Sequence, residues 1–171
     1  MQQLHPVKKL HELLLHMKIE IWSDVVCPFC YIGKRHFEKA VAQLPFKDEM
    51  EVEWRSFQLN PDLQHDPSKD LYTYLAELKG QTREWSVTMH AQVSEMALAA
   101  GLHYRFDIAK LANSFDAHRL IQLARKHGIS DVLEEALFRA YFTEGALISD
   151  HVTLTKLAVE AGLNKDEVER V

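Results

Sequence analysis

The spacing of hydrophobic residues changes after the first third of the chain. Residues 18–26 are a short apolar run rich in Ile, Val and Trp, and residues 51–57 alternate charged with apolar side chains. Both patterns are typical of β-strands. Between them, Pro28 suits the first turn of a helix that ends before Pro45. Because a helix connects the two strands, we expect a right-handed crossover and a parallel pair.

From residue 70 onward the apolar positions recur every three or four residues, which predicts only helices. A loop over 60–69, with two prolines and two aspartates, separates them from the strands. Within this helical part of the chain, glycines mark where helices end and charged first turns mark where the next ones begin. The predicted helices cover 70–78, 82–100, 115–126, 130–141 and 151–160, a last one begins at Asn164, and a short turn is expected near 108–113.

This order of elements predicts an α/β fold that begins with a β-α-β unit and continues with helices alone. A parallel sheet of two strands is not stable by itself. We therefore expect the missing strands either beyond the end of this sequence or in another copy of the chain.

Charge and composition narrow the class of protein. The formal net charge of the 171 residues is −5, which leaves no broad basic surface for nucleic acid or anionic lipid. No apolar run reaches the ~18–20 residues of a membrane span, and residues 1–16 lack the core and cleavage site of a signal peptide. We expect a cytoplasmic protein with no nucleic-acid or membrane partner, in which 1–16 form an N-terminal extension.

The two cysteines of the sequence, Cys27 and Cys30, share one short window at the strand-to-helix junction. Two intervening residues on a helical turn bring the Cα atoms within the ~4.4–6.8 Å that a disulfide allows. At the cap position, Cys27 can receive N–H groups of the first turn, which stabilise a thiolate together with the helix dipole. We therefore expect Cys27 to attack a disulfide and Cys30 to resolve the resulting mixed disulfide.

Two other interpretations of the cysteine pair stay open at this point, inert buried cysteines and half of a zinc site. The zinc site is the weaker of the two, because there is no second cysteine pair and no histidine pair at ligand spacing near the first. We expect no metal and no cofactor.

Four segments together resemble the DsbA-like thioredoxin-fold oxidoreductases, in particular their FrnE-type branch. They are 23–35 around the cysteines, 57–61, 112–120 and 141–150. The resemblance extends over about 17–171. It implies a thioredoxin-like βαβ unit with a large all-helical insertion, and dithiol–disulfide chemistry in the cytoplasm.

The resemblance also implies a division into domains. Residues 17–66 would form the N-terminal part of the thioredoxin-like domain, 67–162 the helical insertion, and 163–171 the start of the return. Thioredoxin-like families place a cis-proline beside the cysteine pair, in the strand after the insertion, whereas all five prolines here lie at or before position 67. We therefore expect the C-terminal strands of the thioredoxin fold to be absent from this chain, which would be truncated at its C-terminus.

Several further side chains are candidates for the site. Asp24 would either tune the pKa of the cysteines or accept backbone N–H groups at the turn. Phe29 lies between the cysteines and is expected to contact substrate. Asn113 and His118 belong to a segment that carries the resemblance, and they would either line a cleft between the domains or make an ordinary contact between them.

A stripe at helical spacing, formed by Trp85, Met89 and Met96, is expected to be core more than a substrate surface.

The leading functional hypothesis is a thiol–disulfide oxidoreductase that acts on a disulfide- or thiol-containing protein or small molecule, glutathione included. An alternative is a glutathione-dependent transferase or isomerase of the kappa or 2-hydroxychromene-2-carboxylate isomerase type. Such enzymes activate glutathione with a single Ser or Cys, so the second cysteine argues against them. A third hypothesis is a non-enzymatic, chaperone-like module. A homodimer is a further expectation.

Overall fold

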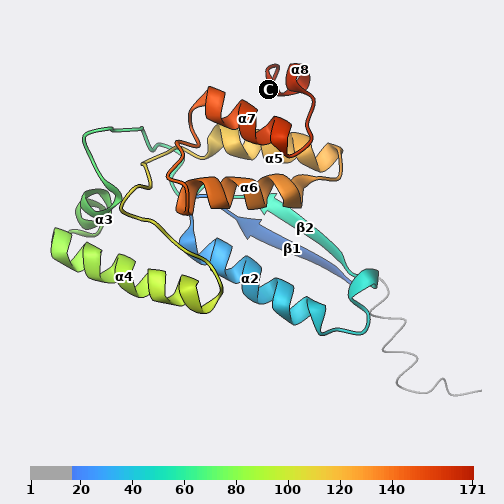
Figure 1. Ribbon diagram of the computed structural model, residues 1–171, viewed down its shortest axis with the longest axis horizontal. Coiled ribbons are helices and arrows are strands. Elements are labelled where there is room, and N and C mark those ends of the chain that lie inside the picture. Colours follow the sequence, from blue (N-terminus) through green and yellow to red (C-terminus); the bar gives the residue numbers. More distant parts are fainter. Residues whose placement is uncertain (1–16) are drawn as a thin grey trace, which may run out of the picture.

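The computed structural model describes residues 17–171, and the extension expected over 1–16 lies outside the described residues. The chain begins with strand β1 (Lys18–Ser23), helix α2 (Pro28–Ala42), a 3-10 turn (Lys47–Glu49) and strand β2 (Glu51–Ser56). Helices follow from there to the end: α3 (Leu71–Lys79), α4 (Arg83–Ala99), α5 (Phe115–Lys126), α6 (Ser130–Phe142), α7 (His151–Glu160) and α8 (Lys165–Val168). Figure 1 shows α3 with α4 at one side of the molecule and α7 with α8 at another.

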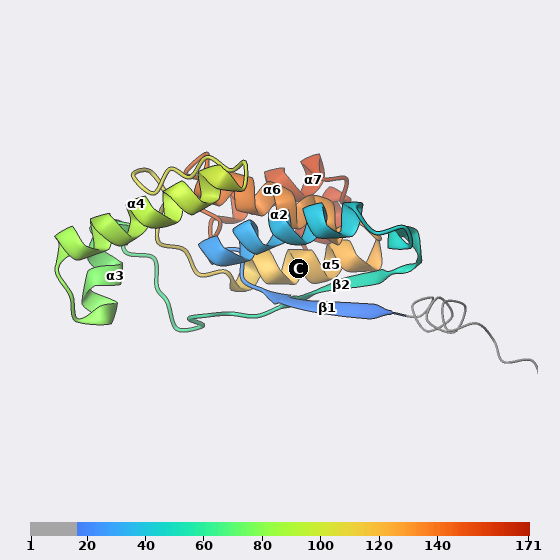
Figure 2. The ribbon, with the colours of Figure 1, turned by 90° about the horizontal axis from the view of Figure 1, so that it is seen from below.

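The two strands pair in parallel, with Lys18 opposite Glu51 and Ser23 opposite Ser56, so the expected parallel pair is confirmed. Within residues 17–171 the sheet has only these two strands. Helices α2 and α5 both lie on one side of it (Figure 2). The other side carries charged residues, among which the Lys18 ammonium contacts the Glu53 carboxylate at 2.8 Å. Ion pairs near the surface contribute little to stability.

The predicted elements are confirmed to within a few residues, with two corrections. The first strand ends at Ser23 and not at residue 26, because the Cys27 N–H donates to the Asp24 carbonyl oxygen at 3.0 Å and closes a turn. The turn expected near 108–113 lies earlier, where the N–H groups of Ile108 and Ala109 both donate to the Arg105 carbonyl oxygen.

The helix that carries the cysteines is anchored to α6 by stacked aromatic rings. Tyr31 lies on Phe138 with ring centroids 4.6 Å apart and planes 4° apart. Tyr104, from the segment after α4, stacks on Phe142 at 4.5 Å, and its hydroxyl donates to the Pro28 carbonyl oxygen at 2.7 Å. Such buried ring pairs are worth about 0.5–1.5 kcal/mol each beyond the area they bury. They fix the first turn of α2 against the helical part of the chain.

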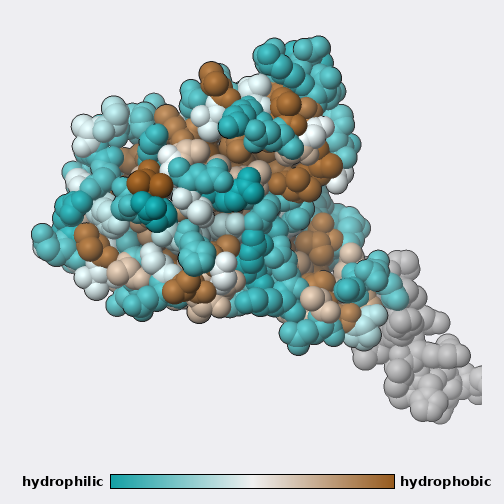
Figure 3. Space-filling model, viewed as in Figure 1, coloured by the Kyte–Doolittle hydropathy of each residue, from teal (hydrophilic) through white to brown (hydrophobic). Residues whose placement is uncertain are grey.

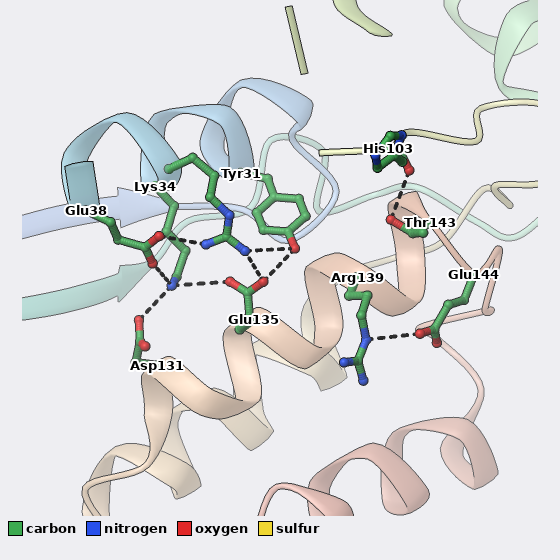
Figure 4. Close-up of polar contacts among 10 residues, drawn as sticks. Tyr31, Lys34, Glu38, His103, Asp131, Glu135, Arg139, Thr143 and Glu144 are labelled. Atoms are coloured by element: carbon green, nitrogen blue, oxygen red, sulfur yellow. Dashed lines mark hydrogen bonds and ion pairs between the residues drawn. The ribbon is translucent and has the colours of Figure 1, made fainter. Parts of the chain in front are cut away.

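A buried ammonium group adds a polar connection between the same two helices (Figure 4). The Lys34 side chain is 2% exposed, and its Nζ lies 3.0 Å from the Asp131 carboxylate and 3.3 Å from that of Glu135. Burial would lower the pKa of Lys34, but the carboxylates of Glu38 and Asp131 outweigh it and raise the pKa. Because a buried charge needs its partners, this cluster holds α2 and α6 at one relative orientation.

The face in Figure 3 mixes hydrophilic and hydrophobic side chains. None of the helices over 17–171 has the length and apolar composition that a membrane span requires. The boundaries expected at 66/67 and 162/163 stay predictions.

Candidate active site

The cysteine pair lies at the start of α2, as the sequence predicts. Cys27 is the N-cap residue, with φ −90° and ψ 114°, and Pro28 occupies the first turn. The Cys30 N–H donates to the Cys27 carbonyl oxygen at 3.1 Å. Both thiols are free, and their sulfur atoms lie within hydrogen-bonding reach of each other. The helix start therefore positions two thiols for disulfide exchange.

The interaction between the two thiols lowers the pKa of one and raises the pKa of the other. A hydrogen bond from the Cys27 thiol lowers the pKa of Cys30 to about 6, with smaller help from the Asp24 N–H and the Ser23 hydroxyl, although burial opposes it. The pKa of Cys27 is correspondingly raised, first by that same hydrogen bond and then by burial, while the N–H groups of Cys30 and Phe29 act to lower it. With this side-chain arrangement the hydrogen bond between the thiols therefore lowers the pKa of Cys30, whereas the sequence predicted a lowered pKa for Cys27.

An apolar groove of about 480 Å³ opens beside the pair. Cys27 and Phe29 line it and Cys30 does not. Much of its wall comes from α3, α4 and the segment that follows α4, including Leu75, Leu78, Trp85, Met89 and Phe106. Phe29 is 54% exposed, and Leu59, which lies in the β2–α3 loop and also lines the groove, is 60% exposed. Two exposed apolar side chains beside a reactive sulfur mark a surface that a substrate can cover.

The stripe expected to be core is divided by its position along α4. Trp85 and Met89 are half-buried and line the groove, whereas Met96 is 50% exposed and does not. The expectation of a core stripe is therefore wrong for Met96, because the buried face of α4 runs instead through Val93 and Ala97.

Asp24 lies in the turn before Cys27 and is 1% exposed. Its carboxylate accepts the Leu59 N–H at 2.7 Å and lies 3.2 Å from Nε2 of His118. Burial would raise the pKa of Asp24, but the hydrogen bonds of His118, Leu59 and Ser114 outweigh it and hold the pKa below its usual value. The Asp24 carboxylate therefore accepts hydrogen bonds from backbone N–H groups. Its negative charge also acts to raise the pKa of Cys30.

Asn113 and His118 lie outside the groove. The Asn113 amide donates to the carbonyl oxygens of Pro61 and Leu63, both at 2.9 Å, and its oxygen accepts from Gln58 and the Phe115 N–H. All of its hydrogen-bonding capacity is thereby used to fasten the loop after β2 to the start of α5. His118 is 6% exposed and faces Asp24. The structure brings both residues near the turn that carries Cys27, through contacts between elements.

Two buried residues that the sequence did not single out, Ser23 and Glu134, act on or respond to Cys30 through their effects on pKa. Each is 2% exposed. Glu134 lies at three- and four-residue spacing from Leu137 and Phe138, so a carboxylate on the apolar face of a predicted helix was the available signal. Over 17–171, no group of three or more His, Cys, Asp or Glu side chains is arranged to hold a metal ion.

Comparison with known proteins gives three informative matches. The Bacillus subtilis (strain 168) protein YwbO, itself described as uncharacterized, is 31% identical over 153 residues, which are 85% of this chain and 66% of that protein. A crystal structure of a probable DsbA oxidoreductase, SCO1869 from Streptomyces coelicolor, superposes with a TM-score of 0.83 at 38% identity, over 91% of this chain and 67% of that one. A putative protein disulfide isomerase from Nitrosomonas europaea has a TM-score of 0.57 at 15% identity, over 90% and 72%, and so shares the fold.

This chain thus spans about two thirds of the length of the Bacillus relative. The matches confirm the thioredoxin-like fold with a helical insertion that the sequence predicts. The family model for the DSBA-like thioredoxin domain matches residues 18–171, nearly everything that the structure describes. With that match and the cysteine pair at the start of α2, the chain belongs to the DSBA-like thioredoxin domain family.

Proposed function

We propose that this protein catalyses thiol–disulfide exchange, with Cys27 as the attacking and Cys30 as the resolving cysteine. One observation carries the assignment of roles: Cys27 lines the groove and Cys30 does not, although the two thiols interact directly. An attacking sulfur needs access to the substrate, whereas a resolving sulfur needs access only to its partner.

The reaction is an exchange of bonds between sulfur atoms. The Cys27 thiol first passes its proton to Cys30. The Cys27 thiolate so formed attacks one sulfur of a substrate disulfide, and the other substrate sulfur leaves with the electron pair. Cys30 then loses that proton, which leaves with the substrate as a thiol, attacks Cys27, releases the second substrate sulfur and leaves a Cys27–Cys30 disulfide. The substrate is reduced and the dithiol oxidised, and the same steps run in reverse when the protein starts as the disulfide.

The groove favours a substrate with apolar groups next to its sulfur. Among the described residues that line the groove, Lys79 is the only lysine or arginine. Glutathione carries two carboxylates, which such a wall would pair poorly. A peptide segment with an apolar side chain, or an apolar small-molecule disulfide, fits this wall better than glutathione does. This argues against the glutathione-dependent transferase or isomerase.

The remaining expectations from the sequence stay predictions. They are membership of the FrnE-type branch, a cytoplasmic setting and a homodimer. The chaperone-like alternative predicts an activity that survives loss of both cysteines.

The test is disulfide reduction of insulin and of a model peptide by wild type, Cys27→Ser and Cys30→Ser. No other cysteine is present in the sequence, so every mixed disulfide that forms reports on one position. Cys27→Ser should reduce the rate to background, and Cys30→Ser should accumulate a mixed disulfide visible by mass spectrometry. Full activity of Cys27→Ser would refute the proposal.

A further inference from the structure

A histidine lies in the wall of the apolar groove beside Cys27. His90, on α4, is half-buried and lines the groove together with its helix neighbours Met89 and Val93. Most of the other side chains that line the groove are aliphatic or aromatic. A polar ring in such a wall restricts what can fill the groove, because a polar atom that a substrate covers loses its water and needs a new partner.

One nitrogen of the His90 ring already has a partner. Nδ1 lies 2.8 Å from the Ser86 carbonyl oxygen, one turn earlier in α4, and 3.3 Å from the Ser86 hydroxyl. Because a carbonyl oxygen can only accept, Nδ1 carries a proton and donates it. Burial lowers the pKa of His90, although the Ser86 carbonyl and the charge of Asp70 act against it, so the ring is neutral at pH 7. A neutral imidazole has one N–H, which leaves Nε2 as an acceptor.

The other nitrogen, Nε2, is free to bind a substrate. It meets no hydrogen-bond partner among residues 17–171, and it keeps contact with solvent. The ring is held by Tyr72 of α3, with centroids 4.9 Å apart and planes at 75°, and by Phe106, at 4.6 Å and 76°. An acceptor on a ring that its neighbours already hold loses little conformational freedom when a donor binds to it.

Two aromatic rings separate His90 from the cysteine turn. Phe106, which contacts His90, lies next to Tyr104 with centroids 5.4 Å apart, and the Tyr104 hydroxyl donates to the carbonyl oxygen of Pro28, the residue after Cys27. A substrate whose sulfur lies at Cys27 therefore needs a long side chain to reach Nε2. That side chain must be apolar along its length to cover the groove wall, and it must end in a donor. Tyrosine has both properties.

We propose that His90 determines substrate specificity, because its Nε2 accepts a hydrogen bond from a donor at the far end of an apolar substrate side chain, such as the phenol of a tyrosine. This inference rests on the proposed function, because it concerns the disulfide that Cys27 attacks. The preferred substrate is a disulfide-bonded peptide with a tyrosine near its cysteine. A phenylalanine in the same place would cover Nε2 and leave it unpaired, which a site built for a hydrogen bond disfavours.

The first test compares two peptide disulfides that differ in one hydroxyl group. Each is a homodimer linked through a single cysteine, with a tyrosine or a phenylalanine two residues before it, on the same side of an extended chain. Wild type should reduce the tyrosine peptide with a kcat/KM about fivefold higher, mainly through a lower KM, as expected for one hydrogen bond between neutral groups. Equal values, or a preference for phenylalanine, would overturn the proposal.

Variants of His90 assign the preference to one side chain. His90→Phe keeps an aromatic ring but removes the acceptor, and should show no preference between the two peptides. His90→Gln can place an amide oxygen near the position of Nε2, and should retain part of the preference. His103→Phe changes an exposed histidine outside the groove, and should prefer the tyrosine peptide as wild type does. A preference that persists in His90→Phe would show that another group binds the hydroxyl, and would overturn the proposal.

The second test measures binding without the exchange reaction, in a variant that carries both Cys27→Ser and Cys30→Ser. In an NMR titration, 2-naphthol should bind about fivefold more tightly than 2-methoxynaphthalene, which lacks the donor, and should shift the ¹⁵N resonance of His90 Nε2. Equal binding, or a proton on Nε2 in the free protein, would overturn the proposal. Absence of Cys27-dependent reduction of both peptides would instead refute the proposed function and would leave the binding result unaffected.

Discussion

Nε2 of His118 lies 3.2 Å from Oδ1 of Asp24, although the two residues are 94 positions apart in the chain. Asp24 precedes the cysteine turn and His118 lies on α5, so this contact joins the thioredoxin-like unit to the helices that follow it. Because the Asp24 carboxylate only accepts hydrogen bonds, Nε2 carries the donated proton. The Leu59 N–H completes the site from the loop after β2.

Removal of the Asp24 carboxylate should therefore destabilise the whole chain. Asp24→Ala leaves the Leu59 N–H and the His118 Nε2–H buried without an acceptor. We expect a loss of about 3–5 kcal/mol in the free energy of unfolding, typical of a broken buried pair. Urea denaturation measures it. As a control, Asp62→Ala changes an exposed carboxylate in the loop that contains Leu59. It should change the free energy of unfolding by about 0.5 kcal/mol or less. A loss below ~1 kcal/mol for Asp24→Ala would contradict this account.

The same carboxylate should make stability depend on pH in the acid range. Its pKa is lowered in the folded state, so it binds protons more weakly there than in the unfolded chain. Its contribution is complete above the unfolded pKa of ~3.9 and is lost as the pH falls through the lower folded value. The difference in the free energy of unfolding between wild type and Asp24→Asn should shrink between pH 5 and pH 2. A difference that stays constant over this range would contradict the shift.

The thiol pKa values depend on the presence of both cysteines. The pKa of Cys30 is about 6, chiefly because the Cys27 thiol donates to it. In Cys27→Ala that donor is gone, and burial should move the pKa above the ordinary ~8.5 of a thiol. The rate of alkylation of Cys30 by iodoacetamide, measured against pH by mass spectrometry, gives the midpoint. A midpoint still near 6 would show that Ser23 and the Asp24 N–H suffice.

The groove should contribute to substrate affinity at Met89 and not at Met96. Both methionines lie on α4, but only Met89 lines the groove. Met89→Lys should lower kcat/KM for a peptide disulfide with apolar neighbours about tenfold, the loss of roughly 1.4 kcal/mol of apolar contact. Met96→Lys should leave it unchanged. Equal effects of the two variants, or none for Met89→Lys, would show that the substrate binds elsewhere.

Gly145 is required by its backbone conformation and its surroundings. Its φ is +67°, and a Cβ atom there would lie 2.7 Å from the Ile108 carbonyl oxygen. Gly145→Ala should cost about 2 kcal/mol or more in the free energy of unfolding, because both the left-handed backbone and the contact oppose a side chain. Gly33→Ala meets nothing within 4 Å inside α2 and should stabilise by about 0.5–1 kcal/mol. Thermal or urea unfolding of the pair of variants tests both signs.

The sequence predicted the parts of the site that depend on neighbouring residues. A β-branched run, a proline in the first turn and the four-residue spacing were enough to place Cys27 at the start of a helix. Helical periodicity and glycine stops likewise located α5 and α7 to the residue. These features are set by backbone geometry and by hydrogen bonds within one or two turns.

The tertiary structure alone decided which side chains act on the thiols. The imidazole of His118 contacts the Asp24 carboxylate. Met89 lines the groove beside Cys27, whereas Met96 does not. Ser23 acts to lower the pKa of Glu134 as well as that of Cys30, although Glu134 lies more than a hundred residues further along the chain. Contacts of this kind depend on how α4, α5 and α6 pack against the strand-to-helix turn. The periodicity of apolar residues predicts which face of a helix is buried. The partner of each buried polar group depends on how the elements pack against one another, and the local sequence does not determine that packing.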